Sequence, residues 1–193
     1  EYMEEEVLYI YMSFAAFHWA IMGSLMTGEW PELSMRVKRR LPQSFLGRAF
    51  FTWFNPGPGT GYMFACCGMI AAGATACILL LAGMMSGVGR NIGGGDMQSV
   101  FAFAVLAPAY VIVYLGIGLL LVRFLRRFTQ ATLFVAALVQ VLLVTAGTAG
   151  PFVLGSMIDS QAFGGYSLIQ ITNPFWSVVH VVDGGSLPPE APV

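Results

Sequence analysis

Four long stretches of the chain are almost purely apolar and contain no Asp, Glu, Lys or Arg; they cover residues 7–26, 64–85, 100–122 and 131–155. About 20 helical residues are needed to cross the apolar part of a bilayer, and each stretch has roughly that length. Length and repetition separate these stretches from buried helices of a soluble protein. The pattern predicts an all-α fold, a polytopic transmembrane helix bundle with about four spans that forms a single membrane domain over residues 1–193.

The composition agrees with a membrane protein. Of the 193 residues, 57% are hydrophobic and 10% are charged, and the mean hydropathy is +0.74. A soluble domain has about a quarter of charged residues, so this chain has too few to cover a soluble core. The composition excludes a nucleic-acid binder, a disordered chain and a disulfide-rich secreted scaffold. The three cysteines all lie in the second apolar stretch without a Cys-x-x-Cys pair, and we expect them to be small buried hydrophobes.

The basic residues alternate between loops. Five follow the first stretch, one follows the second, three follow the third and the two ends have none: Arg36, Lys38, Arg39, Arg40 and Arg48, then Arg90, then Arg123, Arg126 and Arg127. Basic loops face the cytoplasm in multi-pass proteins. The loops 27–63 and 123–130 are therefore predicted to be cytoplasmic, and both termini and the segment 156–193 are predicted to lie outside.

The long loop 27–63 contains a basic run followed by an aromatic one. Ser44 is a suitable N-cap, and from Phe45 to Phe54 the apolar residues recur at helical spacing with Arg48 opposite. This pattern predicts one interfacial amphipathic helix at the inner leaflet. Two hypotheses stay open for the loop: a lipid anchor that orients the protein, or a docking element for a cytosolic partner, since it is longer than a simple connection needs.

Few residues in the chain could support chemistry. His18 lies near the middle of the first stretch, and the only other histidine, His180, lies in the segment expected outside, so no second metal or haem ligand is available at matching depth. We expect His18 to be neutral and hydrogen-bonded to a neighbouring helix. The turn Gly87–Asp96 lacks the spacing of a phosphate-binding loop, and no nucleotide-binding motif surrounds the single lysine, Lys38. We therefore expect no enzyme activity, metal site or cofactor, and a flexible outer turn at 87–96.

Small residues are concentrated in the second stretch. Gly68 with Ala72 and Gly73 with Cys77 are each four residues apart, a spacing that lets membrane helices approach closely. We expect this stretch to form a central helix of the bundle.

The C-terminal region contains an apolar run that is too short to span. The run from Phe175 to Val182 has about eight residues, whereas a span needs about 20. Pro174 and the adjacent aromatic residues are typical of an interfacial or re-entrant turn.

The order of spans and loops resembles that of a known family. Together with the stretches LPQSFLGRAFFTWFNPGPGT at 41–60 and ITNPFW at 171–176, it is similar to the permease subunits of ABC transporters of the ABC-2 (type V) exporter class. The resemblance implies six spans with cytoplasmic ends, a coupling segment between spans two and three, and re-entrant outer helices before the last span. This chain would be a fragment covering spans two to five of a protein of the bacterial inner membrane.

The resemblance also implies roles for the long loop. The segment from Glu32 to Leu41 would couple to a separate ABC ATPase subunit, and the aromatic helix would act as an interfacial lever. The residues concerned are Glu32, Leu33, Arg36, Lys38, Arg39, Arg40 and Leu41 for coupling, and Phe45, Arg48, Phe50, Trp53 and Phe54 for the lever. A second permease copy or a homologue would complete the transporter. A non-transporting membrane subunit that anchors a larger complex, and a haem or quinone subunit that uses His18, stay open as alternatives.

Overall fold

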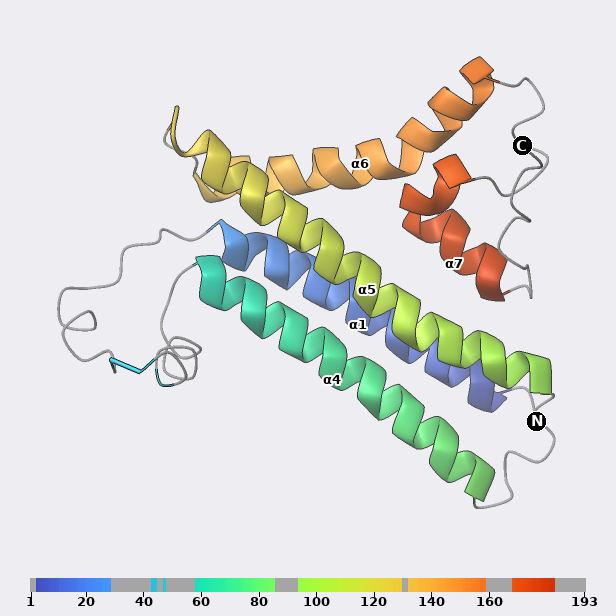
Figure 1. Ribbon diagram of the computed structural model, residues 1–193. Helices are drawn as coiled ribbons and strands as arrows, with labels where there is room; N and C mark the ends of the chain where they lie inside the picture. Colours follow the sequence, from blue (N-terminus) through green and yellow to red (C-terminus); the bar gives the residue numbers. More distant parts are fainter. Residues whose placement is uncertain are drawn as a thin grey trace.

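The structure is a computed structural model that describes residues 3–28, 43–44, 47, 58–85, 94–129, 132–158 and 168–182. Within these residues the fold is all-α (Figure 1). The elements are α1 (Met3–Thr27), α4 (Pro58–Met85), α5 (Gly94–Leu125), α6 (Leu133–Ile158), a 3-10 helix η2 (Leu168–Thr172) and α7 (Pro174–Val182). By length and composition, α1, α4, α5 and α6 can each cross a membrane, which confirms the predicted four-span helix bundle.

Three helices, α1, α4 and α5, begin earlier than the apolar stretches suggested. α4 begins at Pro58 rather than Phe64, because proline is well suited to the first position of a helix, where its missing N–H is not needed. α5 begins at Gly94, so the prediction of a flexible turn reaching Asp96 is wrong at its C-terminal end. Thr132 caps α6, since its carbonyl and hydroxyl oxygens accept the backbone N–H groups of Ala136 and Val135, with N–O distances of 3.1 and 3.4 Å.

Three helices, α1, α4 and α5, pack against one another along their lengths. Trp19 of α1 lies over Gly68 of α4, and a Cβ atom at Gly73 would lie 2.9 Å from the Ala104 carbonyl oxygen of α5. The predicted close approach at the small residues is therefore confirmed. α5, however, also contacts α6 and α7, whereas α4 packs mainly on α1 and α5. The prediction that α4 is the central helix is wrong, because small residues set how near a neighbour comes and not how many neighbours a helix has.

The last two elements, η2 and α7, pack against both α5 and α6 (Figure 1). α5 and α6 are joined at the arginine end of the bundle, which we define by Arg123, Arg126 and Arg127, and they diverge from there. α6 changes direction in its C-terminal half, where it contains Pro151. A proline inside a helix removes one backbone hydrogen bond and bends the helix at that point.

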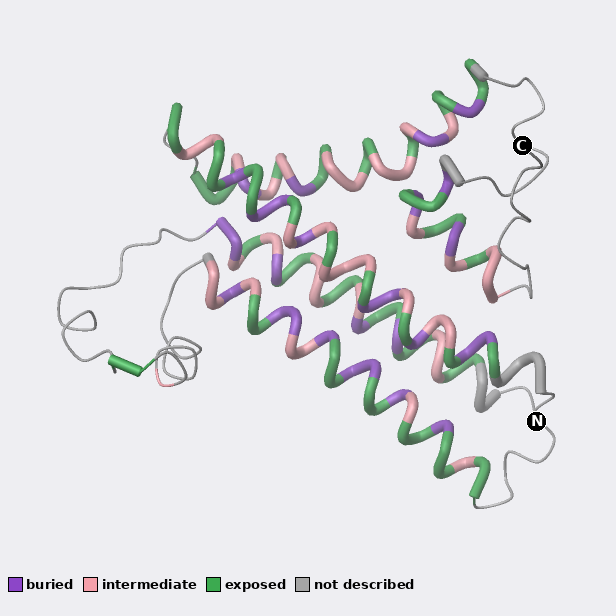
Figure 2. Tube along the Cα trace, in the orientation of Figure 1, coloured by how far each residue is buried: buried purple, intermediate pink, exposed green. Residues whose placement is uncertain are grey.

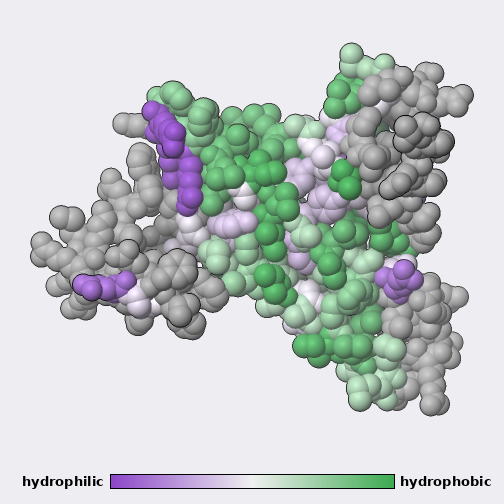
Figure 3. Space-filling view, in the orientation of Figure 1, coloured by the Kyte–Doolittle hydropathy of each residue, from purple (hydrophilic) through white to green (hydrophobic). Residues whose placement is uncertain are grey.

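Apolar side chains cover the outside of the bundle. Phe14, Ile78 and Phe134 are among many large hydrophobic residues that are well exposed, and Figure 2 shows exposed positions along every long helix. In Figure 3 hydrophobic residues dominate the described part of the visible face, and a hydrophilic cluster lies at the arginine end. Buried polar residues include Gln140 and Asn173. Apolar surfaces around buried polar groups suit a lipid solvent, and the four spans make this a multi-pass membrane protein.

Candidate functional site

The residues predicted to couple to an ATPase and to form the interfacial helix, Glu32–Leu41 and Phe45–Phe54, lie outside the described residues apart from Gly47, and their roles stay predictions. Ser44, immediately before the predicted helix, is described. Its Oγ accepts a hydrogen bond from the Gly47 N–H at 3.2 Å. That is the bond an N-cap makes to the third residue of a helix, in agreement with the predicted cap.

The arginine end brings two parts of the chain together. Arg126 donates a hydrogen bond from Nη2 to the Gly28 carbonyl at 2.7 Å, and the Arg123 guanidinium lies beside Gly59 at the start of α4. Burial, and then the charge of Arg123, lowers the pKa of the Arg126 guanidinium. The long loop therefore leaves α1 and enters α4 at the end where the three arginines lie. The alternating charge pattern requires the loop 27–63 and the loop 123–130 to lie on the same side of the membrane, and this arrangement meets that requirement.

η2 and α7 make several hydrogen bonds to the neighbouring spans α5 and α6. Together we name these two elements the polar hairpin (residues 168–182). Asn173 begins α7 as an N-cap: its Oδ1 accepts the backbone N–H groups of Phe175 and Trp176, each at 3.1 Å. Pro174 occupies the first helical position, where proline is favoured. The carbonyl of Asn173 accepts the Ser177 N–H at 3.0 Å. The turn between η2 and α7 is thus specified by an Asn-Pro pair.

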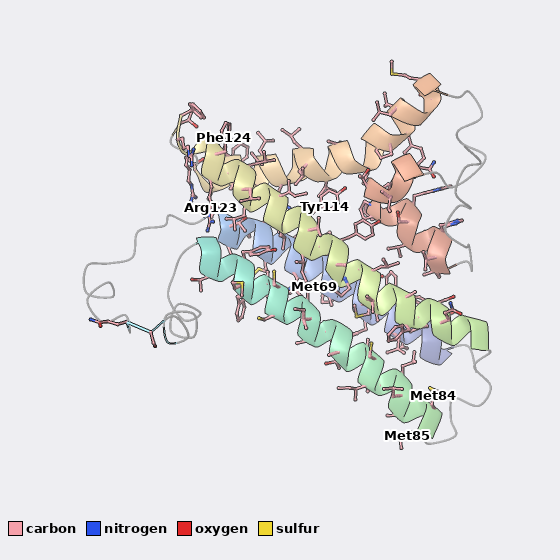
Figure 4. All side chains as sticks on the ribbon, in the orientation of Figure 1. Met69, Met84, Met85, Tyr114, Arg123 and Phe124 are labelled. Carbon is pink, nitrogen blue, oxygen red and sulfur yellow. The ribbon has the colours of Figure 1, made fainter. Side chains whose placement is uncertain are left out.

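Two side chains of α5 and a backbone carbonyl of α6 hold this turn. The Tyr110 hydroxyl donates to the Ile171 carbonyl at 2.6 Å, and the Tyr114 hydroxyl donates to the Thr172 carbonyl at 2.5 Å. Figure 4 shows Tyr114 reaching from α5 toward the hairpin. On the other side, Nδ2 of Asn173 donates to the Thr148 carbonyl of α6 at 3.0 Å. The turn is therefore fastened to both neighbouring spans.

The hairpin ends at the end of the bundle opposite the arginines. Its last residue, Val182, accepts a hydrogen bond from Ser99 Oγ at 2.7 Å, near the start of α5 and opposite the arginine end. Its turn lies beside Tyr110 and Tyr114, which flank the midpoint of the span Gln98–Leu125. α7 therefore runs from about half the depth of the bundle to the end opposite the arginines, which fits a re-entrant turn, one of the two kinds that Pro174 and its aromatic neighbours indicated.

The hairpin turns its polar side inward. Gln170, Asn173 and Ser177 are 3%, 2% and 3% exposed, and Ser177 Oγ donates to the Gln170 carbonyl at 3.2 Å. Large apolar side chains, Phe175 and Val179 among them, are exposed. Buried amides and exposed aromatic residues suit a lipid surrounding, because lipid solvates apolar side chains and offers polar groups no hydrogen bonds.

Sequence reasoning missed the residues that receive the hairpin. Tyr114 lies over Gly147 of α6, in the space that a side chain there would fill. Gly147 is also the residue whose carbonyl loses its usual helical donor at Pro151, four positions later. The sequence offered two signals. Tyr110 and Tyr114 lie four residues apart in an apolar span, and Gly147 and Pro151 have the same spacing. Neither shows which carbonyl a hydroxyl will meet.

The two polar side chains singled out within the spans lie apart. Gln140 is buried against Gly118 of α5. His18 is exposed on α1 and contacts the rings of Phe14 and Trp19 on its own helix. No hydrogen bond joins His18 to any residue that the structure describes, so the predicted bond to a neighbouring helix is not formed among these residues. The reason is its position on the helix, since Met12 and Ala15 occupy the packed side.

Comparison of the chain with protein-family models, with characterised proteins and with solved structures found no match. Among the described residues no three His, Cys, Asp or Glu side chains come together as a metal site would require. The three cysteines form no disulfide, and Cys66 is buried. The geometry of the spans and the polar hairpin therefore carries the functional argument.

Proposed function

We propose that this chain is the membrane-spanning permease component of an ATP-driven exporter of the ABC-2 type in the bacterial inner membrane. The observation that supports this most is the re-entrant polar hairpin. It follows the fourth span, turns beside the midpoint of α5 and ends opposite the arginines. A re-entrant outer element before a last span is what the resemblance to this class implies. A separate ATPase subunit and a second permease copy complete the transporter.

In this proposal ATP is hydrolysed by the partner subunit, and the motion enters the bundle at the arginine end. The segment Glu32–Leu41 receives it, and the interfacial helix predicted for Phe45–Phe54 transmits it to α4. The Arg126–Gly28 hydrogen bond links the end of α5 to the end of α1, so displacement of the loop moves α1, α4 and α5 together. The polar hairpin, bonded to both α5 and α6, is the part that senses how these two spans separate.

The test is co-purification of the full-length gene product from mild detergent. We expect an ATPase with a nucleotide-binding Walker motif to accompany the unchanged protein and to be lost when Arg39 and Arg40 are both changed to Glu. The control is the double change of Arg123 and Arg127 to Glu, which reverses the same number of charges at the arginine end, outside the loop 27–63.

Two outcomes contradict the proposal. If no ATPase accompanies a protein that inserts normally, the chain is a non-transporting membrane subunit and the loop is a lipid anchor. If both double variants lose the ATPase equally, coupling depends on total charge at that end and not on the segment Glu32–Leu41.

A further inference from the structure

One face of α1 is apolar and contacts no other described helix. Its exposed residues recur at alternating spacings of three and four, and they are Val7, Ile10, Phe14, Phe17 and Ile21. The opposite side packs on α4 and α5 through Met12 and Trp19, seven positions apart. Residues spaced alternately three and four apart are typical of the seam along which two helices pair. These residues then occupy the a and d positions of a heptad. We name this face the α1 seam.

The α1 seam is flanked by side chains that lipid does not satisfy. Ser13 and His18 are both exposed beside it, and His18 lies close to the middle of the span Glu6–Thr27. Within the described residues neither side chain makes a hydrogen bond. Polar groups at this depth almost always face protein or water, because hydrocarbon cannot solvate them.

Other exposed polar groups in the spans show the contrast. Thr75 of α4 donates to the carbonyl of Ala71 at 2.8 Å, and Ser156 of α6 donates to that of Val153 at 2.8 Å. Each hydroxyl is satisfied by its own helix and can face lipid. His18 makes only ring contacts on α1, so its imidazole needs a partner from outside the described helices.

The spacing of the polar groups identifies that partner. In a parallel pair of helices, a g residue of one helix lies beside the e residue five positions further along the other. With Phe14 at a, Ser13 is at g and His18 is at e. The preceding pair is Glu6 with Tyr11, and the following pair is Ala20 with Leu25. Each g residue thus faces an e residue of matching polarity. Two copies of one chain insert in the same direction, so their α1 helices are parallel.

We propose that two copies of this chain pair through the α1 seam, with Ser13 of each copy hydrogen-bonded to His18 of the other near the middle of the membrane. A neutral imidazole has one donor and one acceptor nitrogen, so it satisfies a hydroxyl in either sense. Two-fold symmetry makes the bond twice. In Figure 1 α5 passes in front of α1, and the seam is turned away from α4 and α5, so pairing leaves the bundle unchanged.

This inference rests on the part of the proposed function that gives the transporter two membrane subunits. Its test uses disulfide cross-linking of the full chain in lipid bilayers, after Cys66, Cys67 and Cys77 are changed to Ala. We expect Phe14→Cys to cross-link to its own copy and Val141→Cys, on the exposed face of α6, to remain monomeric. The ATPase plays no part in this readout, so pairing and coupling can fail separately.

The register has a sharper signature. When differently tagged copies carry Ser13→Cys and His18→Cys, we expect a disulfide between the two tags, and little disulfide when both copies carry the same change. Only the parallel g-to-e arrangement produces this pattern. Absence of any cross-link at Phe14→Cys in a folded protein, or equal cross-linking at Val141→Cys, overturns the proposal. So does a cross-link at Phe14→Cys to a different helix or protein in place of the second copy.

The hydrogen bond is tested by weakening it. His18→Ala removes both symmetric bonds. From the usual strength of hydrogen bonds between membrane helices, we expect the dimer to become roughly eightfold weaker. Energy transfer between labelled copies in vesicles measures this change. Ser13→Ala should weaken the dimer by the same factor, and the double variant should add nothing further. Independent, additive losses would show that the two side chains do not contact each other.

Discussion

α5 is packed in two different ways on its two sides. Toward α4 the contact is close and apolar: Gly73 lies against the Ala104 carbonyl, and Ala76 and Ala104 are buried together. Toward the polar hairpin it is made by Tyr110 and Tyr114, whose hydroxyls bridge to backbone carbonyls. Lipid chains are as apolar as the side chains of a neighbouring helix, so ordinary apolar contact does not hold two membrane helices together. They associate instead by close backbone approach or by hydrogen bonds. Toward α4 close approach predominates, with the Tyr62 hydroxyl bonded to the Ile112 carbonyl, and toward the polar hairpin hydrogen bonds predominate.

The difference predicts different responses to substitution. An interface of backbone against backbone cannot yield to a larger side chain, because the obstructing atoms are fixed by the helix. An interface of hydroxyls can lose one bond and keep the rest. The first should therefore fail as a whole, and the second should loosen one contact at a time.

The largest effect should follow from Gly73→Val. The added carbon atoms meet the Ala104 carbonyl oxygen and the Pro108 ring, and overpacking against such groups costs about 3 kcal/mol or more. Unfolding in mixed detergent micelles, followed by tryptophan fluorescence, measures the loss. Gly83→Val on the same helix is the control, since a Cβ there has no neighbour within 4 Å. Equal destabilisation by both variants would mean that α4 and α5 do not depend on close approach.

The next effect should come from Asn173→Ala, at about 2 kcal/mol. The substitution removes the acceptor for the Phe175 and Trp176 N–H groups and the donor to Thr148. Hydrogen exchange of α7 should accelerate while that of α4 is unchanged. Asn173→Ser separates the two roles, because a hydroxyl can cap the helix but cannot reach α6. If Asn173→Ser behaves as Asn173→Ala, the bond to Thr148 carries the effect.

Tyr114→Phe and Tyr110→Phe should each have a smaller effect, about 1 kcal/mol, since each loses one hydrogen bond and keeps its ring. The exchange of η2 and the first turn of α7 should rise, and the double variant should raise it further. Tyr62→Phe is a matched control within the apolar side, where the hydroxyl donates to the Ile112 carbonyl at 3.2 Å. An effect of Tyr62→Phe on α7 would contradict the separation of the two sides.

The smallest effect should follow from Ser99→Ala, which removes the hydroxyl that donates to the Val182 carbonyl at 2.7 Å. We expect about 0.5–1 kcal/mol, confined to the last turn of α7 and visible as faster local exchange. Thr75→Val, whose hydroxyl bonds within its own helix, should leave α7 unchanged. Faster exchange across the whole hairpin would instead make Ser99 its main fastening.

Much of the fold could be predicted from residue types alone. Charge-free stretches of bilayer length predicted the four spans, and Pro174 with its aromatic neighbours indicated an interfacial or re-entrant turn. These features are local. A helix has bilayer length whatever surrounds it, and an Asn-Pro pair begins a helix by bonds to the next few residues.

The partners of these elements could not be predicted in the same way. Tyr114 is separated by 58 residues from Thr172, and no local pattern says which carbonyl a hydroxyl meets. The small residues of α4 predicted a close contact but not that α5 would have more neighbours. For His18 the depth could be read from its place in the span, whereas its side of the helix depended on where Met12 and Trp19 packed.

The inward polarity of the hairpin also dictates an order of assembly during synthesis. The Asn173 amide and the carbonyls of Ile171 and Thr172 cannot rest in lipid alone, and the groups that bond to them, on α5 and α6, are made earlier in the chain. A segment this short cannot be retained as a span by its own hydrophobicity. It must wait at the membrane surface until α5 and α6 have met, and then enter between them. The hairpin is therefore the last part of the described chain to reach its place, and its entry marks the completion of the bundle.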